Sequence, residues 1–436
     1  MAQAAAQSPL RRLIANIGWL FASRGVGAAL SIVYLAIATQ SLGASGFGQF
    51  AIILSTVQAI YGIVTFNTWQ IIVRYGAPHV ASGDDAALER LTHMLVRLEA
   101  IAALIGFGLS CLLLTIFAAR FGWSDALRWP AYIYAFVHAA SFRSTTAGLL
   151  RIRDRFRDAA LADAILPITR FIGAVALLAS GWSNSVVAFL AVWALSEVTN
   201  MIALWVAVRP SHRLRAIARA GAPIRQVIGD YPGMLRFAWL TNVGSTFAAI
   251  NQHVVTIAVG LFLGEIAAGF FRLGYQLGQA LAKVAEVLSR ATYTEFSRLR
   301  AHGDPAALAQ LMRQAQRITL IVAAMIVVTL LLAGRPALLL VAGQEFLPAV
   351  PLVYLLGTAA AVDIVGTALE SALLAHDGAR KVLHARIAAT MVLIGSFALL
   401  LGPFGATGAA GAVLCASLVS TGLFWLYARR INPAAP

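Results

Sequence analysis

The sequence has little charge, few acidic residues and only two cysteines. Asp, Glu, Lys and Arg make up 12% of its 436 residues, about half the share usual in soluble domains, while hydrophobic residues make up 60%. Cys111 and Cys415 both lie inside apolar runs, which argues against a disulfide framework and a cysteine-based metal site. No phosphate-binding loop, nucleophile elbow, zinc-protease motif or Cys-x-x-Cys motif is present. We therefore expect neither an enzyme nor a bound metal or organic cofactor.

The composition instead indicates an integral membrane protein with short loops. A spanning helix takes about 20 residues, and hydropathy along the chain predicts twelve of them. The remaining residues are too few for a large soluble domain, which excludes a tethered nucleotide-driven motor or a kinase. The predicted spans cover 14–39, 47–72, 95–118, 129–150, 159–180, 185–208, 234–262, 265–290, 312–333, 347–374, 383–402 and 407–428. The predicted fold class is all-α, with twelve transmembrane helices.

The shortage of acidic residues leaves a formal net charge of +15, and the basic residues are unevenly distributed. If the spans alternate in direction, 25 Lys and Arg residues fall on one side of the membrane and 3 on the other. Loops rich in Lys and Arg face the cytoplasm. The bias predicts that both termini are cytoplasmic, and it explains the net charge without a nucleic-acid partner.

The longest basic connection falls at the midpoint of the chain and separates six spans from six. An offset of 221 residues aligns Gly43 with Gly264 and Gly48 with Gly269. Six spans keep the second half in the same orientation as the first, so we expect a parallel repeat about an axis along the membrane normal. The predicted domains are an N-terminal lobe over 1–208, a basic cytoplasmic linker over 209–232 and a C-terminal lobe over 233–436.

Polar residues inside several spans cannot face lipid and indicate a central aqueous cavity. In the eighth span they recur on one helical face, at Arg272, Gln276, Gln279, Lys283 and Glu286. The second span, its repeat mate, carries a milder stripe that includes Gln58 and Tyr61. We expect the first two helices of each half to line a polar and cationic cavity.

Three cations of the first half complete the intramembrane set. Arg24 and Arg143 lie about 10 Å from the cytoplasmic ends of their spans by helical rise, and Arg170 lies near the midplane. Intramembrane carboxylates are fewer, and the candidates for H⁺ or Na⁺ coupling are Glu197, Asp363 and Glu370.

Plainer explanations exist for most of these charges. Lys283 and Glu286 are spaced to neutralise each other, and Arg24 and Arg143 have the length to reach the cytoplasmic headgroups. Arg170 is too deep for that and favours a cavity or an ion pair. Glu197 and Asp363 are its candidate partners, or else proton or sodium sites.

Several motifs resemble those of the Wzx-type polysaccharide flippases, a family of the multidrug/oligosaccharidyl-lipid/polysaccharide exporter superfamily. The resemblance covers nearly the whole chain, including the plan of six spans plus six. The segments that carry it are Asn16-Ile17-Gly18-Trp19-Leu20, Leu42-Gly43-Ala44-Ser45-Gly46-Phe47-Gly48, Arg74-Tyr75-Gly76-Ala77, Ser289-Arg290 through Phe296-Ser297-Arg298-Leu299, and Gly405-Ala406-Thr407-Gly408-Ala409-Ala410.

The resemblance implies that the protein flips a polyprenyl-pyrophosphate-linked oligosaccharide across the bacterial inner membrane, for O-antigen, capsule or exopolysaccharide synthesis. It also implies polysaccharide polymerase or assembly proteins as partners. Arg24, Arg143 and Arg170 would hold the pyrophosphate, with Arg272 and Lys283 as a second basic station. The expected sugar contacts are Gln58, Tyr61, Gln276 and Gln279.

Three other functions remain open. A cation-coupled drug antiporter of the same superfamily favours acidic residues in its first half, and the first span has none. A major-facilitator transporter would carry Gly-x-x-x-Asp-Arg-x-Gly-Arg after its second span, and the chain lacks this motif there. A glycan polymerase or ligase would have a large outer loop, whereas the longest predicted outer loop covers only about 119–128.

Overall fold

The computed structural model describes residues 9–209, 221, 223–280, 305–375 and 378–431. Throughout these ranges the regular secondary structure is helical, and none of the residues described is in a strand. Eight helical runs are long and apolar enough to cross a membrane, and the first and last of them each contain two of the predicted spans. The twelve predicted spans lie mainly on helix, apart from breaks in the second and fourth, and the eighth is described as far as residue 280. The predicted all-helical membrane fold is therefore confirmed.

The first and last helical runs are each a pair of spans joined at a glycine. Helix α1 (Pro9–Val64) bends at Gly43, with φ 64° and ψ −177°. Helix α16 (Ala379–Ile431) bends at Gly405, with φ 56° and ψ −136°. Positive φ strains residues that carry a Cβ, so these two predicted turns need glycine. Both turns lie where the sequence indicated them.

The helices between these two runs are shorter and often interrupted. In the first half they are α2 (Thr68–Ile71), the π-helix η1 (Ile72–Gly76), α3 (Ala77–Ser82), α4 (Asp85–Phe121), α5 (Asp125–Ala140), α6 (Ser144–Ile152), α7 (Phe156–Ser180) and α8 (Val186–Val208). In the second half they are α10 (Ile224–Asp230), α11 (Met234–Ala249), the π-helix η3 (Ile250–Val254), α12 (Val255–Leu263), a helix over 265–280, α14 (Pro305–Ala342), the 3₁₀-helix η4 (Gln344–Ala349) and α15 (Val350–Ala375).

The chain divides into two compact units. The first unit comprises Met1–Leu42 and Ile53–Val254, and the second comprises Gly43–Ile52 and Val255–Pro436. This division groups 233–254 with the first unit, whereas the sequence repeat places them in the second lobe. The predicted lobes and linker stay a prediction.

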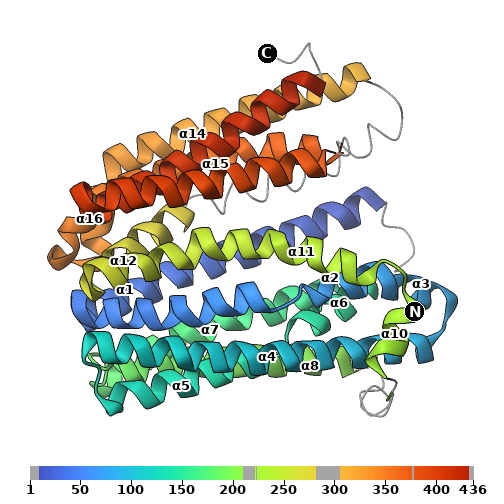
Figure 1. Ribbon diagram of the computed structural model, residues 1–436, viewed down its shortest axis with the longest axis horizontal. Helices are drawn as coiled ribbons and strands as arrows, with labels where there is room; N and C mark the ends of the chain where they lie inside the picture. The colour runs from blue at the N-terminus through green and yellow to red at the C-terminus, as the bar shows by residue number, and fades with distance from the viewer. Residues whose placement is uncertain (1–8, 210–220, 222, 281–304, 376–377, 432–436) are drawn as a thin grey trace. The chain divides into compact units, whose positions relative to one another are not determined.

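The first unit is built on α4, α5, α7 and α8, which are drawn in shades of blue-green to green in Figure 1. Helix α5 packs against α4 and α8, and α8 packs against α7. Near one end of α4 a buried apolar core joins α4 to η1, α6 and α8, through residues such as Ile72, Leu91, Leu149 and Leu204. This core fixes the short helices that follow the interruptions in the second and fourth spans.

The second unit contains α14, α15 and α16, with α15 packed against both of the others. The helix over 265–280 approaches the segment 43–52 closely: a Cβ added to Gly269 would lie 3.0 Å from the Cα of Gly48. The sequence repeat aligns these two glycines, so its two equivalent positions contact each other. A side chain at either position would separate the two backbones.

Large apolar side chains cover the outside of both units. Leu104 in the first unit and Leu332 and Leu340 in the second are each about three-quarters exposed or more. A soluble protein avoids extended apolar surfaces, whereas lipid tails accept them. The exposed leucines thus agree with the composition.

The structure corrects the sequence prediction at two spans that were expected to be continuous. The second span is interrupted over 65–67, between α1 and α2, and the fourth over 141–143, between α5 and α6. Small polar side chains flank both breaks, and such side chains compete for backbone hydrogen bonds. Hydropathy averages over these few residues and does not detect the interruptions.

Candidate functional site

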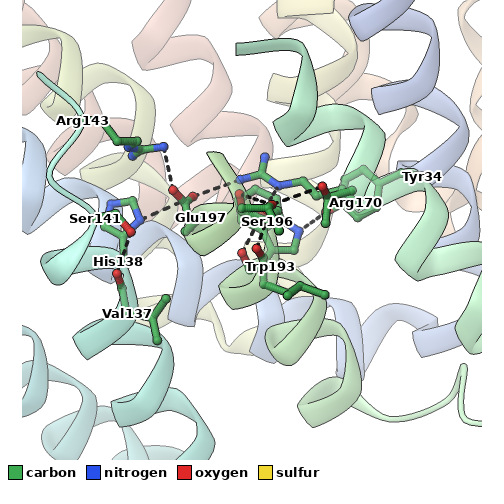
Figure 2. A network of polar contacts seen from close by, with 12 residues as sticks. Tyr34, Val137, His138, Ser141, Arg143, Arg170, Trp193, Ser196 and Glu197 are labelled. Atoms are coloured by element: carbon green, nitrogen blue, oxygen red, sulfur yellow. Dashed lines mark hydrogen bonds and ion pairs between the residues drawn. The ribbon is translucent and has the colours of Figure 1, made fainter. Parts of the chain in front are cut away.

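A buried carboxylate on α8 organises the polar centre of the first unit. Glu197 is 2% exposed and receives one arginine on each oxygen. Its Oε2 lies 2.6 Å from Nη1 of Arg143, and its Oε1 lies 3.1 Å from Nη2 of Arg170 (Figure 2). The two arginines come from different elements, so Glu197 ties three parts of the unit together. We call this group the Glu197 network: Tyr34, His138, Arg143, Arg170, Trp193, Ser196 and Glu197.

The break in the fourth span places Arg143. This residue ends the interruption and precedes the first turn of α6, with φ −110° and ψ −29°. Its side chain turns to Glu197 and keeps 25% of its surface exposed. Arg143 is therefore paired inside the unit, which does not match the alternative that it only reaches headgroups.

Arg170 on α7 is held by three residues on one face of α8. Trp193, Ser196 and Glu197 are spaced three and four residues apart, which places them on the same side of a helix. The Nε of Arg170 donates to Ser196 Oγ at 3.0 Å, and its guanidinium carbon lies 3.3 Å from the Trp193 ring centroid. Trp193 in turn donates from Nε1 to the hydroxyl of Tyr34 at 2.8 Å. Of the two carboxylates considered as partners for Arg170, Glu197 is the one it contacts.

Aromatic and polar side chains continue the network toward α1. His138 Nδ1 lies 3.6 Å from Glu197 Oε1, too long for a hydrogen bond but close enough to attract if His138 were charged. The Tyr61 ring packs edge-on against His138, with centroids 4.9 Å apart. The fully buried Tyr134, also on α5, packs against His138 with ring centroids 5.9 Å apart, and Gln58 lies on α1 one turn before Tyr61. The predicted polar stripe of the second span thus leads to Glu197.

The Glu197 network resembles an anion-binding site whose arginines are already occupied by a carboxylate of the same protein. With His138 neutral, two guanidinium groups and one carboxylate leave one excess positive charge. Each guanidinium carries five N–H donors, and the side chains of Arg143 and Arg170 stay 25% and 15% exposed. Guanidinium pairs with phosphate oxygens in the same geometry as with a carboxylate. The N–H donors that hold Glu197 are therefore of the kind that also binds phosphate oxygens.

A second buried carboxylate, which the sequence analysis missed, joins the two helix breaks. Glu99 on α4 is 4% exposed. Its Oε1 accepts from the hydroxyl of Thr68, the first residue of α2, and from Thr145 near the start of α6. We call Glu99, Thr68 and Thr145 the Glu99 cluster. Glu99 lies inside the predicted third span over 95–118, and a carboxylate within an apolar span was the available signal.

The second unit holds the remaining predicted residues in separate contacts. Arg272 is buried and lies close enough to Tyr275 to act on it electrostatically, as does Asp363. Gln276 and Gln279 are half-buried on the same helix as Arg272. Asp363 is exposed and lies near Ser417 of α16. Because it lies in the middle of a span, we expect this carboxylate to face water rather than lipid.

The last three predicted site residues differ in what the structure shows of them. Glu370 forms a bidentate pair with Arg386, at 2.7 and 2.9 Å from Nη2 to its two oxygens. Arg24 lies on α1, but its side chain is outside the part of the structure described, and Lys283 lies outside the described residues altogether. The Lys283–Glu286 pairing therefore stays a prediction.

The chain is similar in sequence to a known protein family and to a bacterial membrane protein. The sequence profile described as polysaccharide biosynthesis protein matches residues 13–300. The inner membrane protein YghQ of Escherichia coli (strain K12) is 25% identical over 354 residues, which cover 80% of this chain and 97% of YghQ.

Two solved structures have the same fold. An inward-facing multidrug resistance transporter of the MATE family, in the MOP superfamily, has a TM-score of 0.77 at 15% identity and covers 94% of this chain and 95% of its own. The lipid II flippase MurJ, in an inward closed conformation, has a TM-score of 0.75 at 13% identity and covers 94% and 87%. Both likenesses extend over nearly the whole of this chain and support the membrane fold expected from the sequence.

Proposed function

This protein belongs to the polysaccharide biosynthesis protein family of membrane transporters, and we propose that it flips a polyprenyl-pyrophosphate-linked oligosaccharide from the cytoplasmic to the outer leaflet of the bacterial inner membrane. The observation that carries the proposal is the pair of part-exposed arginines, Arg143 and Arg170, on the single carboxylate of Glu197. The product would enter synthesis of O-antigen, capsule or exopolysaccharide.

The task requires a polar passage and an anion site. A sugar headgroup cannot cross about 30 Å of hydrocarbon without losing its hydrogen bonds to water. Alternating exposure of a polar cavity would replace water during the crossing, while the lipid tail stays in the bilayer. The pyrophosphate is the charged group that such substrates share, whatever sugars they carry. Arginine recognises it in bidentate fashion.

Glu197 serves in this proposal as an internal counterion that the substrate displaces. Without substrate it neutralises one of the two guanidinium charges and keeps both side chains in place. Pyrophosphate oxygens would take over the N–H donors of Arg143 and Arg170. Glu197 would then lie beside His138, at the present 3.6 Å, as an ionised or protonated group. The site thus changes its charge with loading.

The other predicted residues keep the roles expected from the sequence. Arg24, Arg272 and Lys283 would add basic charge along the path, and Gln58, Tyr61, Gln276 and Gln279 would contact sugar. Asp363 and Glu370 would couple transport to H⁺ or Na⁺, and both termini would face the cytoplasm. Polysaccharide polymerase or assembly proteins would receive the product.

The likeness to a MATE transporter keeps drug antiport as a second candidate. The Glu197 network argues against it, because an excess of positive charge repels cationic drugs. MurJ, named as a lipid II flippase, is a structural relative whose stated substrate is itself a lipid.

The test is flipping of a fluorescent polyprenyl-pyrophosphate oligosaccharide in sealed vesicles. We expect Arg143→Gln and Arg170→Gln to slow flipping about 10- to 100-fold at low substrate, since a hydrogen bond to a charged group contributes roughly 1.5–3 kcal/mol. Arg170→Glu would abolish it. The matched control is Arg128→Gln, which removes an arginine from an exposed pair with Asp125 and should keep the wild-type rate.

Two results would overturn this function. If Arg170→Glu flips the substrate at the wild-type rate, the network does not hold pyrophosphate. Export of a cationic dye with no flipping of the glycolipid would establish the drug antiporter instead.

A further inference from the structure

The Glu99 cluster lies where two interrupted spans meet. Thr68 begins α2 after the break over 65–67, and Thr145 follows the break over 141–143. The first turns of α2 and α6 also contact each other directly, because the backbone N–H of Trp69 donates to Ser144 Oγ at 3.0 Å. Interrupted helices at membrane depth require that their freed backbone groups find partners. Here a carboxylate from a third helix, α4, accepts from one of these freed groups, the backbone N–H of Thr145.

The two oxygens of Glu99 have opposite surroundings. Oε1 accepts from Thr68 Oγ1, from the backbone N–H of Thr145 at 2.7 Å and from Thr145 Oγ1 at 2.6 Å. Oε2 is buried, and within the described part of the chain it has no hydrogen-bond partner. Donors on Oε1 favour an ionised carboxylate, whereas a bare buried oxygen disfavours it. The balance between the two decides the charge of Glu99.

Two titratable groups on neighbouring elements act electrostatically on Glu99 within the described residues. They are Arg143, in the α5–α6 break, and Tyr61, on α1. The guanidinium of Arg143 is occupied by Glu197, and the contacts from α2 and α6 are threonine hydroxyls and one backbone N–H. No full positive charge therefore pairs with Glu99 in the arrangement described.

We propose that Glu99 binds a proton that holds the two helix breaks together, and that loss of the proton lets them separate. A protonated Glu99 keeps Oε1 as acceptor and leaves no uncompensated charge on Oε2. When the proton passes from Oε2 to water, the resulting carboxylate needs donors on that oxygen. Water supplies them only if α2 and α6 move apart. This inference deepens the proposed transport function, because it makes Glu99 a coupling site for H⁺ in the first unit.

Hydrogen exchange of the backbone amides tests the proposal without any substrate. The amide of Thr145 itself donates to Glu99, so the segments 65–71 and 141–147 report on the junction. Protection factors, corrected for the intrinsic pH dependence of exchange, would be measured on the full chain in lipid nanodiscs. On the alkaline side of the titration, we expect wild-type protection in both segments to fall about tenfold per pH unit.

Three variants separate protonation from a merely structural role. Glu99→Gln imitates the protonated acid and should keep both segments protected at every pH. Glu99→Ala removes the acceptor, and both segments should exchange fast at every pH. The matched control is Glu89→Gln, the same change near the start of α4, which should follow the wild type.

An infrared difference spectrum supplies a second readout. The carbonyl band of a protonated carboxylic acid should appear at acid pH in the wild type and in Glu89→Gln, and be lost in Glu99→Gln. Three outcomes would overturn the proposal. Amide protection in the wild type could be independent of pH, or the Glu99→Gln variant could keep the pH dependence. Protection could also change with Na⁺ concentration at constant pH. Neither readout involves flipping, so failure of the flippase function would not be mistaken for failure of this inference.

Discussion

Replacing Glu197 with Gln removes the only negative charge from the Glu197 network and leaves two guanidinium groups beside a neutral amide. Breaking a buried ion pair by removing one partner costs about 3–5 kcal/mol, because the remaining charge stays buried and uncompensated. The side chains of Arg143 and Arg170 are 25% and 15% exposed, so solvent screens part of that penalty. We therefore expect Glu197→Gln to lower the free energy of unfolding by about 2–3 kcal/mol.

A double-mutant cycle separates the ion pair from general packing damage. Arg143→Gln combined with Glu197→Gln removes one positive and one negative charge and leaves Arg170 on Ser196 and Trp193. The cost of the double variant should be smaller than the sum of the single costs by about 1–3 kcal/mol, the range found for residues in one polar network.

Equilibrium unfolding in sodium dodecyl sulfate, followed by the fluorescence of the nine tryptophans, provides the measurement. Arg128→Gln is the control, since its exposed pair with Asp125 should contribute only about 0–1 kcal/mol. If the single costs of Arg143→Gln and Glu197→Gln add to within about 0.5 kcal/mol, Glu197 does not hold Arg143 and the proposed counterion role fails.

The same variant gives a functional readout. With the internal competitor removed, inorganic pyrophosphate should inhibit flipping at a concentration about tenfold lower in Glu197→Gln than in the wild type, equivalent to about 1.4 kcal/mol. An unchanged inhibitory concentration would mean that Glu197 and the substrate do not share donors.

Three further predictions concern packing, a turn and ion coupling. Gly148→Ala would place a Cβ 1.9 Å from Cγ2 of Ile72, so it should force α6 from η1 and cost about 1–3 kcal/mol in the same unfolding titration. Gly108→Ala, which meets open space, should change stability by no more than about 1 kcal/mol. Gly43→Ala should cost about 1–2 kcal/mol in that titration, because it puts a Cβ on a left-handed φ of 64°. Asp363→Asn should remove the acceleration of flipping by an imposed H⁺ or Na⁺ gradient and leave the gradient-free rate near wild type; gradient-driven flipping that persists would exclude Asp363 as a coupling residue.

The membrane fold was accessible from the sequence because its signals are local. A run of about 20 apolar residues has few alternatives to a spanning helix. Gly43 and Gly405 mark turns whose backbone only glycine adopts cheaply. The repeat offset aligned Gly48 with Gly269 as equivalent positions but did not predict that they meet, and the structure brings their backbones close together.

The candidate site was only partly accessible because its geometry is not local. Arg143, Arg170 and Glu197 were found as charges that a bilayer tolerates only with partners. Their arrangement depends on the break over 141–143, and that break is stabilised by Glu99, 46 residues from Thr145. No window along the sequence contains both. A carboxylate that satisfies an interruption in another helix therefore looks, in the sequence, like an ordinary charge near a helix end.

Arg143 connects the two proposals, because it pairs with Glu197 and acts electrostatically on Glu99. A nearby positive charge favours the ionised form of a carboxylate. If pyrophosphate binds Arg143 as proposed, it cancels that charge and favours the proton on Glu99. Linkage is reciprocal, so protonation of Glu99 must strengthen pyrophosphate binding by the same factor. Substrate and proton would then be bound in the same state, with the helix breaks held together, and loss of one would promote loss of the other.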